Sequence, residues 1–463
     1  MRRMRSIWPI TAVTVSFFVA CGSSDDGSSG AGGGGNSGPG AGTGGDLFNG
    51  SSGTGEPCQG LQCQQVQCSG GAKTTVTGTV YEPAGKTPLY NVIVYVPNAP
   101  LDPIPEGATC DQCGTVSGDP VVTALTDTAG KFVLEDVPVG SDIPLVIQVG
   151  KWRREITIPS VGECVDTPIT DVESTSLPSN QNEGHIPKIA LTTGGADSLE
   201  CWLRKIGLED SEFTPETGTG RINLYGGSDG AAQYAPSMNG GVPLTTAQTF
   251  WSNPAAVNSY DIVLLSCEGD QFVDTKPQVA RQAMEDYASL GGRVFASHWH
   301  NVWFEQGPAG FSSVATWNFF QGDPPDPFNT LIDQSFPKGE AMAQWLTNVG
   351  ASTVPGELLI NEPRSTIGTI DANLTRRWIY GQQFPAVQYF SFNTPAGAPD
   401  NELCGRVVFS DLHVSAADQE GAAFPGGCVT TELSPQEKAL LFMLFDLSSC
   451  IDPDEDPTPP APK

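Results

Sequence analysis

The stretch "AMEDYASLGGRVFASHWH", residues 283–300, decides how the larger part of this chain folds. Its first half belongs to a longer run, residues 276–292, in which apolar residues recur at helical spacing before two glycines. The short apolar run "GRVFAS" that follows is typical of a buried strand. We therefore predict a helix, a turn and a strand that ends at His298 and His300. The residues expected on one side of that helix are Val279, Ala283, Tyr287 and Leu290.

The same alternation of strand and helix extends over residues 185–450. Further apolar runs predict strands at 188–193, 260–266, 386–392 and 405–411. Further helices are expected at 199–206, 338–350 and 434–449, and the last carries the capping-box pair Ser434 and Glu437. Strands that alternate with helices and are apolar throughout indicate a doubly wound, mostly parallel α/β sheet.

A different pattern precedes this region. Residues 73–175 contain short runs of alternating apolar and polar residues, separated by glycine, proline and aspartate turns. Such runs predict a small all-β sandwich. "GTVYEPAG", "PLYNVIVYVPN" and "TDTAGKFVLEDVPVG" are similar to the carboxypeptidase regulatory-like, transthyretin-like domain. That resemblance implies a spacer or a module that binds glycan or protein.

The amino-terminal residues resemble a bacterial lipoprotein signal. Three arginines precede the apolar stretch 7–20, and "FVAC" ends it at Cys21. The resemblance implies that residues 1–20 are removed and that Cys21 is lipidated. Residues 21–56 are rich in glycine and serine and predict a flexible tether. We expect a cell-envelope lipoprotein, in the outer membrane, whose membrane contact is this anchor.

The overall charge narrows the choice of partners. Acidic residues outnumber basic ones by 52 to 23, which gives a net charge of −29. Nucleic acids are bound mainly through lysine and arginine, so no nucleic-acid partner is expected. Residues 451–463 are acidic and rich in proline, and they predict a disordered tail.

The cysteines indicate disulfides in an exported chain. Of twelve cysteines, Cys21 is assigned to lipid, and the odd number that remains implies an unpaired thiol. The cysteine-rich segment 57–72 predicts a disulfide knot with Cys164 as a further member. The spacing allows three further pairs, Cys110–Cys113, Cys201–Cys267 and Cys404–Cys428, with Cys450 left as the free thiol. A Cys201–Cys267 bond would exclude Cys267 as a nucleophile.

Polar residues gather where the predicted parallel strands end, which is where ligands bind in such sheets. His298, His300 and His413, with Asp411 or Glu268, could hold a divalent metal such as zinc. Alternatively, Cys267 is a nucleophile with a histidine as its base. A third interpretation is that these residues only cap strands or contact a ligand. The catalytic candidates are Cys267, Ser297, His298 and His413, and the ligand-binding candidates are Thr193, Asp197, Glu268, Asp270, Trp299 and Trp303.

An aromatic-rich insert follows His300, with tryptophans and phenylalanines over residues 303–320. Aromatic faces at the rim of a sheet could stack on sugar rings or cover a pocket. Packing of the insert onto the sheet is the alternative.

"YDIVLLSCEGD", "AMEDYASLGGRVFASHWH" and "CGRVVFSDLHVS" resemble the class I glutamine amidotransferase-like fold and, within it, the ThuA-like branch. That family carries its nucleophilic cysteine after the strand that here ends at Ser297 and His298. Its catalytic His-x-Glu pair corresponds to His413 and Ser415. The resemblance therefore implies an amidotransferase-like fold with altered site chemistry.

Taken together, the sequence predicts a lipid-anchored, two-domain lipoprotein. Its expected role is that of a surface module that binds glycan or protein. The alternative is a metal-dependent or cysteine-dependent hydrolase that acts on glycan or peptide in the envelope or outside the cell.

Overall fold

The computed structural model describes residues 57–114, 116–414, 417, 419, 421–452 and 457–462. Pro57–Lys463 forms one compact unit. The predicted signal segment, the lipid attachment at Cys21 and the tether 21–56 lie outside the described residues. Among the helices of the described part, none has the length and apolar character needed to cross a membrane.

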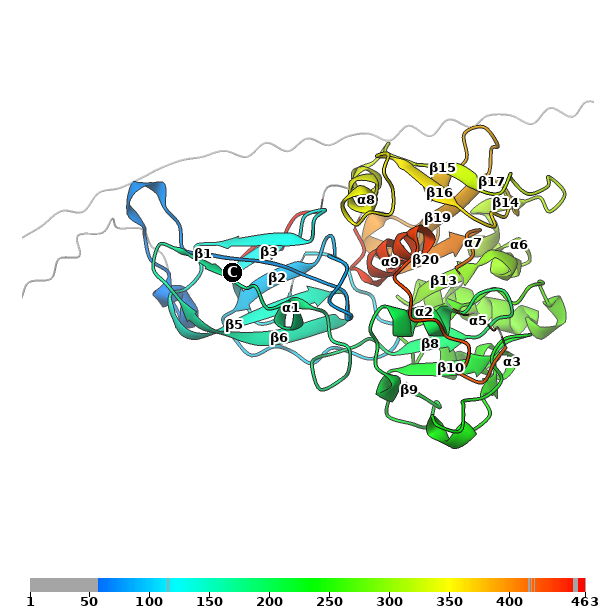
Figure 1. The fold of residues 1–463 in the computed structure, drawn as a ribbon, viewed down its shortest axis with the longest axis horizontal. Helices are drawn as coiled ribbons and strands as arrows, with labels where there is room; N and C mark the ends of the chain where they lie inside the picture. Colours follow the sequence, from blue (N-terminus) through cyan, green and yellow to red (C-terminus); the bar gives the residue numbers. More distant parts are fainter. Residues whose placement is uncertain are drawn as a thin grey trace, which may run out of the picture. The chain divides into compact units, whose positions relative to one another are not determined.

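Two antiparallel-dominated sheets form a small β-sandwich at the start of this unit (Figure 1). Side chains alternate between buried and exposed along Lys131–Glu135, as the pattern of the sequence predicts. Val76, Val94 and Leu145 are fully buried in the core of the sandwich. The three-stranded sheet has the order β4 (Lys131–Glu135), β1 (Thr75–Thr79), β7 (Asp166–Pro168), and the four-stranded sheet has the order β3 (Pro120–Leu125), β2 (Ile93–Pro97), β5 (Gly140–Val149), β6 (Trp152–Val161).

A single large sheet organises the rest of the unit. Its first six strands pair in parallel, and the strands beyond β20 pair antiparallel, so the expected mostly parallel sheet carries an antiparallel extension. A separate pair joins β14 (Ala315–Trp317) to β17 (Ile367–Ile370). The strands in order are β11 (Thr245–Thr246), β10 (Ile222–Gly226), β8 (Ile189–Thr192), β12 (Ile262–Leu265), β13 (Arg293–Ser297), β20 (Gly405–Ser410), β19 (Val387–Thr394), β18 (Arg376–Tyr380), β15 (Phe328–Ile332) and β16 (Glu357–Ile360), with β9 (Phe213–Thr214) beside β10.

Helices cover both faces of this sheet. One core contains residues of α2, α8 and α9 and continues into the sandwich, and the other contains residues of α3, α4, α5, α6 and α7. The capping box of Ser434 and Glu437 forms as predicted, and the helix that it starts is buried on nearly all sides. The helices are α1 (Val172–Thr175), α2 (Leu199–Lys205), α3 (Ala247–Trp251), α4 (Pro254–Val257), α5 (Gln278–Ser289), α6 (Val302–Glu305), α7 (Ala309–Ser312), α8 (Pro337–Asn348) and α9 (Pro435–Ser448).

The buried face of α5 differs in part from the expected one. Ala283 and Tyr287 are buried as predicted, whereas Val279 and Leu290 are 60% and 54% exposed. Ala280, Met284 and Ala288 complete the buried face instead. A helical face is set by the sheet beneath it, and small residues are often chosen where a helix packs closely on strands.

The disulfides correct most of the pairs expected from spacing. Cys68 does pair with Cys164, and the thiol without a disulfide in the described part is the buried Cys267 rather than Cys450. The local Cys110–Cys113 bond and the Cys201–Cys267 and Cys404–Cys428 pairs do not form. The observed bonds are Cys58–Cys63, Cys68–Cys164, Cys110–Cys404, Cys113–Cys450 and Cys201–Cys428.

Two of these disulfides join the loop 98–119 of the sandwich to the α/β part. The described residues of the segment 451–463 also have defined partners. Ile451 pairs with Gln112, and the hydroxyl of Thr123 donates to the carbonyl of Pro460 over 2.6 Å. The sandwich and the larger sheet are therefore held together by covalent bonds, hydrogen bonds and one continuous core.

Candidate functional site

The site lies where four neighbouring parallel strands end. The order β10-β8-β12 means that the chain moves to one side of β8 and then to the other. Ligands bind at such a switch in open α/β sheets because the loops that follow the strands diverge there. The strands β8, β12, β13 and β20 bring their following residues to this edge, as the sequence predicts.

Three side chains from three of these strand ends meet. Sγ of Cys267 lies 3.5 Å from Nδ1 of His298, and Nε2 of His413 lies 3.0 Å from the same Nδ1. All three donor atoms fall within 4.8 Å of one another. Cys267 is 0%, His298 3% and His413 9% exposed, so His413 marks the side of the cluster nearest to solvent.

The cluster is not satisfied by hydrogen bonding alone. Nδ1 of His298 offers either one lone pair or one hydrogen, yet both the sulfur and Nε2 of His413 approach it. One of the two contacts is therefore left without a hydrogen bond of its own. Three donor atoms that converge in this way are typical of a metal site.

Burial keeps these groups uncharged. It lowers the pKa of His298 to about 2 and that of His413 to about 4, with a smaller contribution from the nearby positive charge of Arg364. Burial also raises the pKa of the Cys267 thiol well above its usual range. A thiolate–imidazolium pair, which a cysteine nucleophile needs, is therefore disfavoured, whereas neutral imidazoles keep their lone pairs free.

His298 occupies a sharp turn between β13 and the next helical turn. Its backbone φ is +36°, in the left-handed region that is unfavourable for a side chain with a Cβ. Strain of this kind persists only where the surroundings enforce it, and it is frequent at functional sites. The turn directs the imidazole toward the end of β20, where His413 lies.

The carboxylate of Asp197 connects the ends of three strands through hydrogen bonds. It accepts a short hydrogen bond from the hydroxyl of Ser297 and further bonds from the backbone N–H groups of Val414 (2.9 Å) and Cys267 (3.4 Å). Burial raises its pKa to about 7 in spite of these donors. Asp197 and Ser297 thus position the cluster, and neither is among its three donor groups.

His300 does not join the cluster, which corrects its predicted role as a metal ligand. Residues His298–Asn301 form a 3₁₀ turn rather than a continued strand, so side chains two apart point in directions about 120° from each other. The indole N–H of Trp303 donates to Nδ1 of His300 over 2.9 Å, and Nε2 lies 2.8 Å from the carbonyl of Ser266. Both ring nitrogens are therefore occupied, and His300 orients the residue before Cys267.

Asp411 is likewise engaged elsewhere, which corrects the other predicted ligand. Its two carboxylate oxygens accept from the backbone N–H and the hydroxyl of Thr366, at 2.8 and 2.6 Å. Burial raises its pKa to about 6. Thr193 is also used internally, because its hydroxyl donates to the carbonyl of Ala231 over 2.8 Å.

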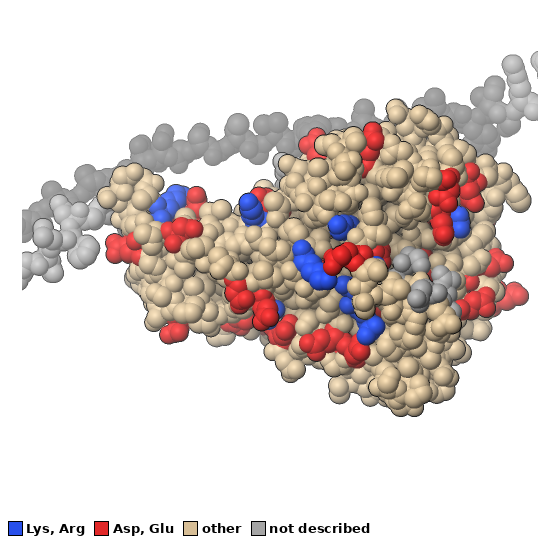
Figure 2. Space-filling model, viewed as in Figure 1, with Lys and Arg blue, Asp and Glu red and all other residues tan. Residues whose placement is uncertain are grey.

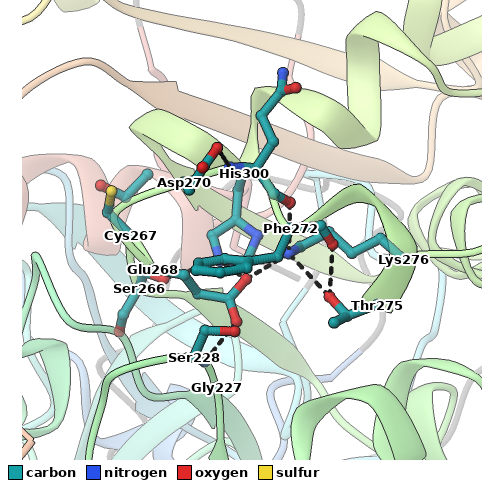
Figure 3. A network of polar contacts seen from close by, with 12 residues as sticks. Gly227, Ser228, Ser266, Cys267, Glu268, Asp270, Phe272, Thr275, Lys276 and His300 are labelled. Carbon is teal, nitrogen blue, oxygen red and sulfur yellow. Dashed lines mark hydrogen bonds and ion pairs between the residues drawn. The ribbon is translucent and has the colours of Figure 1, made fainter.

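Glu268 belongs to a second, buried network beside the cluster (Figure 3). Its carboxylate pairs with the ammonium of Lys276 and accepts from the backbone N–H of Ser228 at 2.7 Å. Lys276 also donates to the carbonyl of Gln271 at 2.9 Å and is fully buried. Figure 3 shows the sulfur of Cys267 apart from this pair. The network therefore fixes the loop after β12, and the thiol of Cys267 takes no part in it.

The remaining predicted residues divide between surface and core. Asp270 is exposed and accepts from the backbone of Gln271. Trp303 is fully buried and donates its indole N–H to His300. Trp299 is half-buried, lies 4.7 Å from His298 between ring centroids and stacks on Phe319. Much of the insert packs onto the sheet, and the Trp299–Phe319 pair remains beside the cluster.

Sequence reasoning missed Lys276 and the loop 361–366. Lys276 stands in a helix-start segment that carries no motif, and its partner Glu268 lies eight residues before it. The loop 361–366 is far in the sequence from the strands that carry the cluster, but Thr366 bonds to Asp411, and Gln436 bonds both to Asn361 and to the carbonyl of His413. No local pattern indicates either contact, because both depend on how the loops fold back onto the sheet edge.

Comparisons with known proteins give only distant likenesses. No family model matches the chain, and no curated protein matches it. A ThuA-like protein from Bacteroides uniformis matches with 10% identity over 56% of this chain and 90% of that chain, at a TM-score of 0.30. A type II cohesin–X–dockerin complex from Acetivibrio cellulolyticus matches with 20% identity over 31% of this chain and 75% of that chain, at a TM-score of 0.15.

Proposed function

We propose that Cys267, His298 and His413 bind a zinc ion and that the chain is a metal-dependent hydrolase of the cell envelope. The observation that supports this proposal is the convergence of one thiol and two imidazole donors at a strained strand end. Histidine and cysteine are the donors that zinc prefers, and three protein ligands leave a position for water, as in catalytic zinc sites.

The spacing of the donor atoms fits such an ion. Zinc bonds of about 2.0–2.3 Å at tetrahedral angles place neighbouring ligand atoms roughly 3.3–3.7 Å apart. The contacts of 3.5 Å and 3.0 Å at Nδ1 of His298 need only small side-chain adjustments to reach that arrangement. The distances thus support a shared ion better than a hydrogen-bonded pair with a third group nearby.

The residues around the cluster have separate tasks in this proposal. Zinc would supply a bound water that loses its proton near neutral pH and would polarise the scissile group. Asp197 fixes the ends of three strands and so the spacing of the donors. His300 fixes the backbone carbonyl of Ser266, and the Glu268–Lys276 pair fixes the loop that follows β12. A preorganised set of this kind lowers the cost of binding the ion.

The wider setting of this activity follows from the sequence. The lipoprotein-like signal supports an anchored protein outside the cytoplasm, and the amino-terminal sandwich, similar to carboxypeptidase regulatory-like domains, would act as a spacer. The α/β part would be an amidotransferase-like, ThuA-like domain whose nucleophile position is altered. Its substrate would be a glycan or peptide of the envelope or of the cell's surroundings.

A binding role without catalysis is the second candidate. Phe320 is 96% exposed, and the neighbouring Phe319 stacks on the half-buried Trp299. Exposed aromatic faces of this kind favour contact with sugar rings or with another protein. In that case the aromatic surface would act as the glycan-binding or protein-binding site.

Metal analysis of the full chain tests the proposal. The protein is stripped with a chelator, loaded with zinc, dialysed and analysed for metal. We expect stoichiometric zinc in the parent and large losses in Cys267→Ser and His413→Ala. His185→Ala is the matched control, because the fourth histidine bonds to the carbonyl of Lys151 in the sandwich and is expected to leave the metal content unchanged.

Cobalt loading adds a signature that a misfolded variant would not mimic. Cobalt(II) bound to a thiolate absorbs in the near ultraviolet, and this band should vanish in Cys267→Ser while weaker histidine-bound cobalt bands persist. A parent chain that retains no metal overturns the zinc site. Retention of a glycan by such a metal-free chain, lost in Trp299→Ala, would then favour the binding role.

A further inference from the structure

A cavity of about 260 Å³ lies at the junction of the sandwich and the α/β part. Its walls are the segment 82–88 between β1 and β2, the end of α2, the end of α8 and the segment 431–438 that starts α9. The cluster of Cys267, His298 and His413 contributes none of its lining residues. Pockets for drug-sized ligands hold roughly 300–1,000 Å³, so this cavity suits a smaller molecule.

Three lysines from separate segments line the cavity: Lys86, Lys205 and Lys438. This gathering is unusual, because acidic residues outnumber basic ones by 52 to 23 in the chain. Figure 2 shows several basic groups near the middle of the face drawn, where Figure 1 has α2 and α9. Ammonium groups around one cavity repel one another unless anions lie among them. How far a partner already neutralises each lysine therefore decides what the cavity can bind.

Two of the three lysines have carboxylate partners. Lys205 donates to both oxygens of Glu437 at 2.8 Å, and both side chains are buried, so this pair is internal. Lys86 lies 3.2 Å from one oxygen of Glu432, and these two side chains are 58% and 82% exposed. Water screens an exposed pair of this kind, so the pair contributes little free energy. Lys86 can therefore exchange Glu432 for another anion.

Lys438 has no carboxylate partner in the described part of the chain. The hydrogen bond of its ammonium goes to the carbonyl of Val349 over 2.7 Å. An ammonium has three hydrogens, so two remain for a ligand, and a neutral carbonyl leaves the positive charge in place. Lys438 is half-buried, which weakens the screening of its charge by salt and water. It is thus the strongest anion-binding group of the cavity.

A further carboxylate, that of Glu82, also lines the cavity. It accepts hydrogen bonds from the backbone N–H groups of Thr87 at 2.6 Å and of Lys86 at 3.1 Å. Burial raises the pKa of Glu82 to about 7, so this group is partly uncharged at neutral pH. Its oxygens are used within the segment 82–88, and its charge opposes an anion in the cavity only in part.

We propose that this cavity binds a small sugar acid, whose carboxylate lies between the ammonium groups of Lys86 and Lys438. The ligand's carboxylate replaces Glu432 beside Lys86. The hydroxyl groups of the ligand face Asn348 and Thr431, whose polar side chains also line the cavity. Charge-assisted hydrogen bonds from the two lysines supply most of the affinity. The inference goes beyond the proposed hydrolase and does not need its metal, because the cavity and the cluster share no residue.

Calorimetric titration of the full chain tests the proposal. The chain is first stripped of metal with a chelator, so that an anion bound to zinc cannot mimic the result. Glucuronate is the main ligand, glucose carries the hydroxyl groups without the charge, and inorganic phosphate carries charge without a sugar ring. We expect glucuronate to bind the parent, and both other molecules to bind at least about tenfold more weakly.

Two substitutions should move the affinity in opposite directions. Lys438→Met should weaken glucuronate binding by about tenfold or more, because a charge-assisted hydrogen bond is lost, and Lys438→Arg should keep part of the affinity. Glu432→Gln should strengthen binding by about two- to fivefold, because an exposed competitor for Lys86 loses its charge. A gain of this kind cannot come from a misfolded variant. Lys131→Met is the matched control, because Lys131 is exposed on β4 and lies outside the cavity.

A parent that does not bind glucuronate overturns the proposal, as does equal affinity in the parent and a Lys438→Met chain that circular dichroism shows to be folded. If Lys438→Met does not fold, Lys438→Arg and Glu432→Gln still decide. Glucose that binds as tightly as glucuronate removes the role of the lysines, and phosphate that binds more tightly than glucuronate excludes a sugar acid. Unchanged affinity in Glu432→Gln would place the carboxylate away from Lys86 and contradict the proposal. The zinc site is tested separately, by the metal analysis.

Discussion

Nε2 of His413 lies 3.0 Å from Nδ1 of His298, although 115 residues separate the two histidines in the chain. The parallel pairing of β13 with β20 produces this contact, because Ser297 and Ser410 are register partners and both histidines follow them. Cys267 enters from the neighbouring β12. Three strands that share one direction thus deliver three donor groups to one point.

The free thiol provides the first prediction. Cys267 is fully buried and its pKa is raised, so a thiol reagent should modify it slowly in the native chain and fully after unfolding. Zinc should slow the native reaction further. The measurement is alkylation followed by mass spectrometry, with Cys267→Ser as the control for other sites. Rapid alkylation of the native chain at neutral pH would favour a cysteine nucleophile over a metal ligand.

The second prediction separates His300 from the metal ligands. His300→Phe leaves the indole N–H of Trp303 and the carbonyl of Ser266 without their partner. We expect unfolding to become easier by roughly 1–3 kcal/mol, because both groups are buried. Zinc content should stay close to that of the parent. Denaturant unfolding and metal analysis of the same sample check this, and loss of zinc at unchanged stability would restore His300 as a ligand.

The buried pair of Lys276 and Glu268 provides the third prediction. Lys276→Met leaves a buried carboxylate without its cation and should cost about 3–5 kcal/mol of stability. Adding Glu268→Gln removes the uncompensated charge and should recover part of that loss. Thermal unfolding of the two variants and the parent measures both effects. A double variant less stable than Lys276→Met alone would mean that Glu268 has another essential partner.

A pH dependence in the sandwich is the fourth prediction. Burial raises the pKa of Glu82 to about 7 from 4.5, despite hydrogen bonds from the backbone of Lys86 and Thr87. Between these values the unfolded chain releases a proton that the folded chain keeps, so this group's contribution to stability is full below pH 4.5 and is lost as the pH rises toward 7. Glu82→Gln should remove a loss of roughly 1 kcal/mol per pH unit.

Unfolding curves at several pH values between 4.5 and 7.5 measure this difference. Glu155→Gln, at an exposed position of β6, is the control and should follow the parent. A parent and a Glu82→Gln variant with parallel pH profiles would show that the carboxyl group of Glu82 is already ionised near pH 5.

Local patterns predicted the elements well and the contacts between them less well. The helix start at Ser434, the alternation of buried and exposed side chains in the sandwich and the gathering of polar residues at strand ends all appear as expected. The assumption that His298 and His300 share a face fails, because β13 ends at Ser297 and a 3₁₀ turn begins at the next residue. Of the four residues that helical spacing placed on the buried face of α5, two are buried.

The disulfides show the same limit. Spacing along the chain favoured the local Cys110–Cys113 bond, yet each of these cysteines pairs with a partner about 300 residues away. Both partners lie in the α/β part, and their approach depends on how the sandwich packs against it. Cys267 stays unpaired because Cys201 turns toward Cys428 instead.

The amino-acid order is enough to specify which segments become strands or helices, because hydrophobic spacing and capping act over a few residues. It also brings cysteine and histidine side chains to one rim, since parallel strands end on the same edge. Which of those side chains meet is a matter of packing over long distances. His300 and Asp411 lie outside the cluster because they accept hydrogen bonds from Trp303 and Thr366. The loops that carry Lys276 and Arg364 reach the rim only when the sheet is assembled.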